Sequence, residues 1–261
     1  MPCQEERHPA LVLRLQPPRA TTTLARSVKP GSTNIRGRLD EVRSRIARAA
    51  ERAGRDPGSV VLVGVVKTVP EPDIREALGL GLEDLGENRV QEAAAHVEAI
   101  GRTAARWHMV GHLQRNKAAR AVELFDRVHG LDSMSLAEAL SQRAEAAGRR
   151  LRVLIEVNVS GETSKFGAAP GEALELIALA AKLPGLALEG LMTVGPPVAS
   201  PEQARPGFAS LRALRDRGER MLGLRLPELS MGMSSDFEVA VEEGATLVRV
   251  GTALFGARTA Q

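Results

Sequence analysis

The sequence has 261 residues, of which 43% are hydrophobic and 26% charged, so the chain can bury one large core or two modest ones. The net charge of +3 comes from residues 1–32, where five basic residues outnumber two acids, and the rest of the chain is neutral. This balance, together with an aromatic content of 2%, excludes a nucleic-acid-binding module built from a basic face and stacked rings.

Cysteine usage and hydropathy narrow the class further. The single cysteine, Cys3, excludes a disulfide framework and a cysteine-rich metal site, and it favours a reducing, cytoplasmic setting. No apolar stretch approaches the length of a membrane span, and the N-terminus lacks the apolar segment of a signal peptide. We therefore expect neither a membrane partner nor a nucleic-acid partner.

Residues 1–31 have the composition of a disordered tail. They contain five prolines and three successive threonines without a sustained hydrophobic period. A transit peptide is a weaker alternative, because Glu5 and Glu6 are acidic. From residue 32, apolar residues recur at helical spacing until Gly54 and Pro57, which predicts an amphipathic helix before the first strand. We expect two regions, the tail at 1–31 and a folded domain at 32–261.

Strand-like and helical segments alternate through the folded domain. The strands are expected at 60–66, 82–85, 106–110, 127–130, 151–159, 186–191, 228–231 and 246–250. The helices between them are expected at 73–80, 89–100, 116–125, 136–147, 171–182, 201–221 and 234–243. This alternation predicts an α/β fold, a single (β/α)8 TIM barrel with an extra N-terminal helix. A doubly wound sheet is less favoured, since no G-x-G-x-x-G follows the first strand.

The run 60–66 consists of apolar and glycine residues and leads directly to Lys67. A continuous β-branched run is typical of a strand buried on both faces of a parallel sheet. In a barrel, the carboxyl ends of the strands form the face that carries the active site. Lys67 is then either a solvated residue at a strand end or an amine in a partly dry pocket that can act as a nucleophile.

The loops after the seventh and eighth strands lie where barrels commonly bind a phosphate group. Small or hydroxyl-bearing residues suited to that task are Ser230, Gly232, Ser234, Gly251 and Thr252. Either loop could instead be an ordinary turn, with Ser234 as a helix N-cap. Arg249 needs a partner in the interior or in a ligand, because it is a charged residue in an apolar strand. A lysine able to form a Schiff base, a phosphate site and an arginine between them describe a site for pyridoxal 5′-phosphate.

The histidines do not form a metal motif. His108, His112 and His129 are scattered along the sequence, and no carboxylate shares their spacing. We interpret His108 as a group of the core or as one that supports a residue of the site, and we expect no metal.

Seven motifs occur in one order between residues 65 and 258. They are 65–68 (VVKT), 86–92 (GENRVQE), 107–117 (WHMVGHLQRNK), 164–167 (SKFG), 190–193 (GLMT), 229–236 (LSMGMSSD) and 248–258 (VRVGTALFGAR). In these motifs the chain resembles the pyridoxal phosphate homeostasis protein family. The resemblance extends from about residue 35 to residue 258 and leaves the tail outside.

This resemblance implies a single barrel similar to the N-terminal domain of alanine racemase, with pyridoxal 5′-phosphate held on Lys67. It also implies that Asn88 lies near the ring and that Arg249 hydrogen-bonds the pyridine nitrogen. The residues that it places around the phosphate are Ser230, Gly232, Ser234, Gly251 and Thr252. The implied function is intracellular homeostasis and supply of the cofactor without a strong catalytic activity.

Other functions and partners stay open. One alternative is a small racemase of free amino acids, and another is a Schiff-base aldolase that acts on a phosphorylated substrate through Lys67. We expect a monomer or a weak homodimer, with the cofactor as ligand and cofactor-dependent apoenzymes as recipients.

Overall fold

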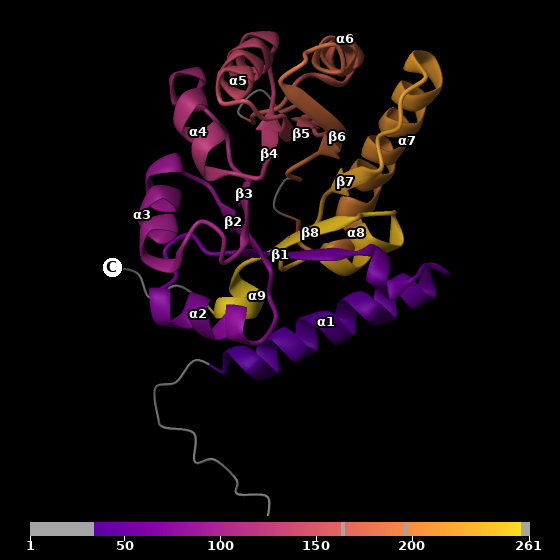
Figure 1. Cartoon of the computed structure of the whole chain (residues 1–261). Coiled ribbons are helices and arrows are strands. Elements are labelled where there is room, and N and C mark those ends of the chain that lie inside the picture. Colours follow the sequence, from indigo (N-terminus) through magenta and orange to yellow (C-terminus); the bar gives the residue numbers. More distant parts are fainter. Residues whose placement is uncertain (1–33, 163–164, 196–197, 257–261) are drawn as a thin grey trace, which may run out of the picture. The chain divides into compact units, whose positions relative to one another are not determined.

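The computed structural model describes residues 34–162, 165–195 and 198–256. Parallel strands close into a barrel in which each strand pairs with its neighbour in the sequence and the last pairs with the first (Figure 1). The strands are β1 (Val61–Val65), β2 (Asp84–Glu87), β3 (Arg106–Met109), β4 (Arg127–Leu131), β5 (Leu151–Glu156), β6 (Leu186–Met192), β7 (Glu228–Ser230) and β8 (Leu247–Val250). The prediction of a single (β/α)8 barrel is confirmed.

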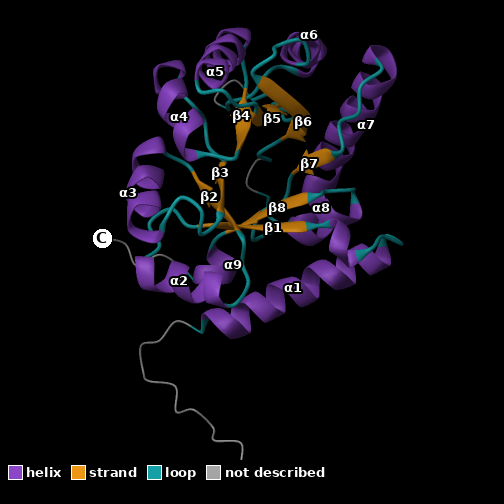
Figure 2. Cartoon of the chain, viewed as in Figure 1, coloured by secondary structure: helices purple, strands orange, loops and turns teal. Residues whose placement is uncertain are grey.

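Helices follow the strands and surround the barrel (Figure 2). They are α1 (Ile35–Arg52), α2 (Glu71–Gly79), α3 (Val90–Ile100), α4 (Ala118–Leu124), α5 (Met134–Ala146), α6 (Pro170–Ala180), α7 (Arg205–Leu222), α8 (Phe237–Glu242) and α9 (Thr252–Phe255). Short 3-10 helices occur at η1 (Pro57–Ser59), η2 (Arg115–Lys117) and η3 (Pro201–Ala204). No helix in the described part of the chain is long and apolar enough to cross a membrane.

The register of the strands decides which side chains enter the barrel. Val63 of β1 lies opposite Asp84 of β2 and opposite Arg249 of β8. Residues paired side by side in parallel strands point to the same face of a sheet, so these three side chains face the same way. Val63 belongs to a small apolar cluster separate from the main core, whose buried members are Val63, Val110, Leu154, Met192 and Leu247.

Charged side chains occupy the amino end of the barrel interior. Arg127 of β4 forms ion pairs with Glu189 at 2.7 Å and Glu228 at 3.2 Å. Arg106 of β3 donates to both carboxylate oxygens of Asp84, at 2.8 and 2.7 Å. Buried charges are stable when they are paired. Asp84 and Arg127 are buried, whereas Arg106 is exposed and reaches Asp84 from the solvent side of this end of the barrel.

Helix α1 precedes the barrel, as the sequence predicted, and it packs against α8 and α9. Its buried residues recur at helical spacing on one face: Ile35, Leu39, Val42, Ile46, Ala49 and Ala50. Asn34 caps the helix through Oδ1, which accepts from Gly37 N at 3.0 Å. Figure 1 shows α1 at the edge of the barrel, next to α2, α9 and α8.

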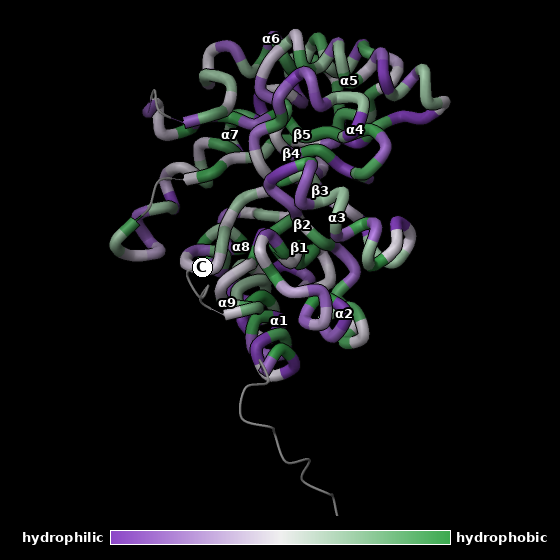
Figure 3. The backbone as a smooth tube through the Cα atoms, turned by 90° about the vertical axis from the view of Figure 1, so that its left-hand side faces the viewer, coloured by the Kyte–Doolittle hydropathy of each residue, from purple (hydrophilic) through white to green (hydrophobic). Residues whose placement is uncertain are grey.

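The main core lies between the strands and the surrounding helices. Its largest fully buried side chains include Trp107 and Phe125, whereas the faces of the helices that point outward are polar. In Figure 3 much of β1 and β5 is coloured hydrophobic, and α1 shows both hydrophobic and hydrophilic turns. Burial on both faces of the sheet explains the continuous apolar run of β1.

The structure also departs from the expected elements. Gly86 and Glu87, expected just outside a strand, belong to β2 and are both buried. The short helices η1 and α9 had no counterpart in the prediction. The tail expected at 1–31 lies outside the described residues, so the division into tail and domain stays a prediction.

Candidate functional site

The residues expected at the cofactor site fall on one arc of the barrel. Lys67 follows β1 and Asn88 follows β2. The others belong to β7, to β8 or to the loops after them: Ser230, Gly232, Ser234, Arg249, Gly251 and Thr252. Since β7, β8, β1 and β2 are consecutive around the barrel, the structure gathers these residues on one side of its carboxyl end. Their roles as cofactor ligands stay predictions.

The turn that carries Lys67 is tight and strained. Val69 N donates to Val66 O at 2.9 Å, which places Lys67 and Thr68 at the corner. Lys67 is half-buried, and Thr68 is exposed. Thr68 has a φ of 62° and is the only residue other than glycine with a positive φ in the described chain. A β-branched side chain in this conformation costs about 1–3 kcal/mol, so the surrounding structure imposes the turn on the local sequence.

Arg249 is buried inside the barrel among neutral partners. Its Nη1 donates to Ser230 Oγ at 2.5 Å, and its Nη2 donates to the carbonyl oxygen of Thr193 at 2.8 Å. Burial lowers the pKa of Arg249 to about 10, although the charges of Glu156 and Asp236 raise it. At neutral pH the side chain is therefore a cation that is held in place by hydrogen bonds to uncharged groups.

The two loops next to Arg249 are tied to each other. Ser234 Oγ accepts from Gly251 N at 3.3 Å and from Ala253 N at 3.2 Å. Gly232 has a φ of 91°, and a Cβ at this position would lie 2.5 Å from the Cβ of Ala240. Only glycine therefore lets this loop pack directly on α8. Ser234 does not cap α8, whose N-cap is Asp236; its hydroxyl connects the β7 loop to the start of α9.

Ser230 and Thr252 lie in different surroundings, although both were expected to donate to a phosphate. Ser230 Oγ is bonded to His129 Nδ1 at 2.8 Å and to Arg249, and the residue is completely buried. Thr252 is exposed at the first position of α9. The hydroxyl of Ser230 is thus engaged inside the barrel, whereas that of Thr252 faces the open end.

Glu156 is a site residue that sequence reasoning missed. It ends β5, is 5% exposed, and its Oε2 has no hydrogen-bond partner in the described part of the chain. Burial, followed by the charge of Asp132, raises the pKa of Glu156 to about 7, while Arg249 opposes this rise. The argument applied to Arg249, a charge in an apolar strand, would have found Glu156 as well.

Glu87 and His96 form a contact next to Asn88 that sequence reasoning also missed. The Glu87 carboxylate lies 2.5 Å from His96 Nδ1 on α3, and Glu87 is completely buried. Burial raises the pKa of Glu87, and the hydrogen bond that His96 donates to the Glu87 carboxylate raises the pKa of His96. This contact joins the end of β2 to α3 immediately before Asn88.

His112 and Phe166 form a stacked pair in the loops after β3 and β5. Their ring centroids are 4.0 Å apart with an interplanar angle of 9°, and His112 Nδ1 is 2.9 Å from Asp132 Oδ2. Phe166 is 57% exposed.

Within residues 34–162, 165–195 and 198–256, no group of three His, Cys, Asp or Glu side chains could hold a metal ion. His108 is buried, as expected for a group of the core.

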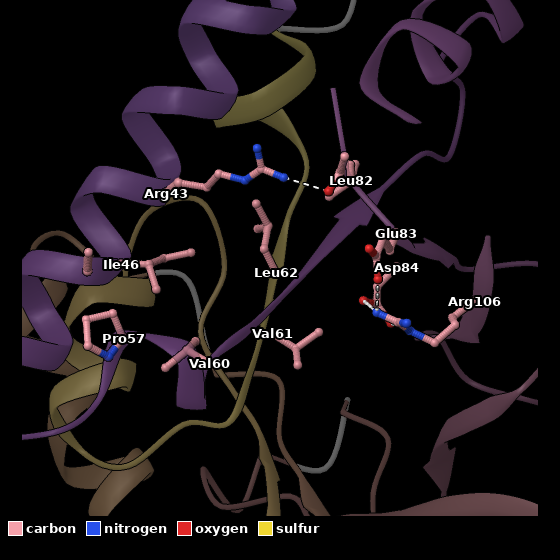
Figure 4. Close-up of a pocket in the computed structure, with 12 residues that line it drawn as sticks. Arg43, Ile46, Pro57, Val60, Val61, Leu62, Leu82, Glu83, Asp84 and Arg106 are labelled. Atoms are coloured by element: carbon pink, nitrogen blue, oxygen red, sulfur yellow. Dashed lines mark hydrogen bonds and ion pairs between the residues drawn. The ribbon is translucent and has the colours of Figure 1, made fainter. Parts of the chain in front are cut away.

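A pocket of about 310 Å³ lies at the opposite end of the barrel. Arg43, Val61, Asp84 and Arg106 are among the residues that line it, so it opens beside the amino ends of β1, β2 and β3 (Figure 4). None of the expected cofactor residues lines this pocket. It is therefore separate from the carboxyl end where Lys67 lies.

The comparisons with known proteins show the family of the chain. Residues 38–259 match the family model described as alanine racemase, N-terminal domain. The pyridoxal phosphate homeostasis protein of Aquifex aeolicus is 47% identical over 221 residues, which cover 85% of this chain and 97% of that protein. The chain belongs to the pyridoxal phosphate homeostasis protein family.

Solved structures give the same barrel for this family. PipY of Synechococcus elongatus PCC7942, solved with PLP bound, is 38% identical with a TM-score of 0.76, and the match covers 85% of this chain and all of PipY. Alanine racemase of Clostridium difficile 630 is 16% identical with a TM-score of 0.67, and the match covers 87% of this chain and 57% of that enzyme. The second likeness shows the fold alone.

Proposed function

We propose that the chain binds pyridoxal 5′-phosphate through Lys67 and handles this cofactor for other proteins rather than turning over a substrate. The observation that carries the proposal is the position of Lys67 beside β8, the strand that holds Arg249 and leads into Gly251 and Thr252. The name of the Aquifex aeolicus relative and the PLP in the PipY structure support the same ligand.

The residues present fit this cofactor chemically. Lys67 offers an amine for the aldehyde, and Arg249 offers a buried cation for a ring atom. Thr252 offers an exposed hydroxyl, and backbone amides of Gly251 and Ala253 already converge on Ser234 Oγ. A set of amide and hydroxyl donors beside a cation suits a phosphate group.

Each residue then has a defined task. Lys67 Nζ attaches the cofactor, and Asn88 contacts the ring from the neighbouring strand. A guanidinium has five N–H donors, so Arg249 can hold Ser230 and Thr193 and still donate to the pyridine nitrogen. The phosphate contacts are assigned to the two tied loops, through Gly232, Ser234, Gly251 and Thr252, while Ser230 holds Arg249.

Arg249 determines how strongly the ring of a bound cofactor can withdraw electrons. Bound pyridoxal 5′-phosphate supplies an aldehyde that reacts reversibly with amines and a ring that can withdraw electrons. Since the pKa of Arg249 is about 10, the guanidinium keeps its proton at neutral pH. A nitrogen that accepts from it stays unprotonated, which weakens the electron sink that a racemase needs.

Two partner and location proposals accompany this function. Cofactor-dependent apoenzymes are the recipients, and the chain works in the cytoplasm as a monomer or a weak homodimer.

A Schiff-base aldolase is the second candidate function, since the same lysine and phosphate donors could hold a phosphorylated substrate. It would leave the purified protein colourless, whereas the bound cofactor makes it yellow.

Reductive trapping tests the proposal. Purified protein incubated with pyridoxal 5′-phosphate and then with borohydride should carry the adduct on Lys67 when its peptides are mapped by mass spectrometry. Lys165 provides the matched control, because it is also half-buried, lies in the loop after β5 and pairs with Glu162 at 3.8 Å. Lys165→Met should leave the adduct in place, and Lys67→Met should abolish it. An adduct on Lys165, or none at all, contradicts the assignment.

A further inference from the structure

A continuous series of hydrogen bonds crosses the barrel interior. Arg249 Nη1 donates to Ser230 Oγ at 2.5 Å, and Ser230 Oγ is 2.8 Å from His129 Nδ1. His129 Nε2 is 2.9 Å from His108 Nδ1, and His108 Nε2 is 2.9 Å from Asp84 Oδ1. All five residues are at most 5% exposed. Because β7 and β4 are not neighbouring strands, the contact between Ser230 and His129 spans the interior of the barrel.

The residues at the two ends of this series each have only one hydrogen-bonding role. Arg249 has donors only, because a guanidinium carries no acceptor. Burial raises the pKa of Asp84, but the hydrogen bonds from Arg106 and His108 outweigh it and lower the pKa to about 2. Asp84 is therefore ionised and can only accept.

The imidazoles between the ends follow from these constraints. Asp84 accepts, so His108 Nε2 carries a proton. Burial lowers the pKa of His108 even though Asp84 raises it, and burial together with His108 and Arg249 lowers the pKa of His129 well below its usual value. A neutral imidazole has one donor and one acceptor. His108 Nδ1 must then accept from His129 Nε2, and His129 Nδ1 must accept the proton of Ser230.

We propose that this series runs in one direction, from Arg249 through Ser230, His129 and His108 to Asp84, and that the two histidines are positioning residues that orient Arg249 toward the cofactor ring. The ligand in this inference rests on the proposed function, whereas the direction of the series does not. The hydroxyl of Ser230 donates its only proton to His129 Nδ1 and accepts from Arg249 Nη1. Ser230 therefore holds Arg249 and is not a donor to the phosphate.

The opposite direction has a recognisable signature. If His108 carried a second proton, its Nδ1 would donate to His129 Nε2, and His129 Nδ1–H would then donate to Ser230 Oγ. The hydroxyl of Ser230 would then be able to donate its proton to a ligand. The charged groups that face the two imidazoles are Asp84, Asp126, Arg127 and Arg249.

The direction can be measured in the ligand-free protein. Nitrogen-15 NMR of histidine-labelled protein should show His108 and His129 as neutral Nε2–H tautomers at neutral pH. The two signals are assigned by their loss in His108→Gln and His129→Gln. A doubly protonated His108, or an Nδ1–H tautomer at His129, overturns the proposal. This outcome is independent of whether the cofactor binds.

The positioning role is tested by two substitutions of one residue. His129→Leu removes both hydrogen-bonding atoms, whereas His129→Gln keeps a donor and an acceptor. We expect His129→Leu to weaken cofactor binding about tenfold or more and to shift the absorbance maximum of the bound cofactor. His129→Gln should restore most of the affinity and the maximum of the unmodified protein. In both variants the borohydride adduct should stay on Lys67.

Leu136→Ala, a fully buried change on α5, controls for a general loss of stability. It should leave the absorbance maximum unchanged. Unaltered binding and absorbance in His129→Leu, or a His129→Gln variant as weak as His129→Leu, contradicts the positioning role. If His129→Leu does not fold, the tautomers and the His129→Gln spectrum still decide the question. If the unmodified protein fails to bind the cofactor, the proposed function fails while the NMR result still stands.

Discussion

Arg249 and Ser230 lie on adjacent strands, and Nη1 of the arginine donates to the buried hydroxyl of the serine at 2.5 Å. Ser230→Ala leaves this N–H and His129 Nδ1 without that partner. We expect the free energy of unfolding of the ligand-free protein to fall by about 1.5–3 kcal/mol, because the bond involves a charged group in a buried site. Denaturant titration followed by circular dichroism measures the change.

Thr252→Ala is the matched substitution at the exposed hydroxyl. It should change the free energy of unfolding by less than about 0.5 kcal/mol, since exposed side chains contribute little to folding. Cofactor affinity should nevertheless fall about tenfold or more, through the loss of one hydrogen bond to a dianion. A loss of stability with unchanged affinity would show that Thr252 serves the fold instead.

The left-handed conformation of Thr68 predicts a stabilising substitution. Asparagine tolerates a φ of 62° better than a β-branched residue does, so Thr68→Asn should raise the free energy of unfolding by about 1 kcal/mol. Thr103→Asn, at an exposed threonine without a positive φ, is the control and should have no such effect. Equal effects of the two substitutions would remove the case for strain beside Lys67.

Glu156 predicts a pH dependence of stability. Its pKa is about 7 in the folded protein against an ordinary value of 4.5, so the folded state holds this proton more tightly than the unfolded chain does. The free energy of unfolding should therefore fall as pH rises between these values and level off above them. Glu156→Gln should be more stable than the unmodified protein at pH 8 by up to about 3 kcal/mol, and equal to it at pH 4.

Denaturant titrations of ligand-free protein at the two pH values measure the effect of Glu156→Gln. Glu138→Gln, on an exposed position of α5, controls for the removal of one negative charge and should show no comparable difference. A Glu156→Gln variant that is less stable at pH 8 would mean that the carboxylate has a favourable partner in the fold.

We expect the holoprotein not to racemise amino acids at enzymatic rates. Two-base racemisation needs a proton donor on each face of the reacting carbon, and the sequence contains no tyrosine to serve opposite Lys67. Loss of a positioned acid or base costs about 10² to 10⁴ in rate. Incubation with L-alanine followed by chiral chromatography checks this. Turnover that is abolished by Lys67→Ala would establish a racemase. Turnover that is also abolished by Glu156→Gln would identify Glu156 as the second acid–base group.

The barrel could be predicted from sequence because long segments carried a clear period. The run before Lys67 is continuous and β-branched, so a buried parallel strand was the natural interpretation. Helix α9 and η1 were missed because elements of four and three residues contain no full period. Gly86 and Glu87 were placed outside a strand because neither residue type favours one, yet tertiary packing buries both in β2.

The sequence contains one local indication of the hydrogen-bonded interior. Strands β3 and β4 each begin with Arg-x-His, at 106–108 and 127–129, and residues two apart in a strand point to the same face. This repeat places both histidines inside the barrel. Their contact with each other and with Ser230 depends on the register and closure of the barrel, which no local pattern reveals.

The paired charges around Arg127 and the Asp84 end of the series from Arg249 to Asp84 lie in the barrel on the side away from the strand ends that lead to Lys67. If the cofactor is held on Lys67 as we propose, it enters and leaves at the carboxyl end of the barrel. A recipient protein bound over that end to take the cofactor would at the same time block a second cofactor molecule, so loading and transfer would alternate.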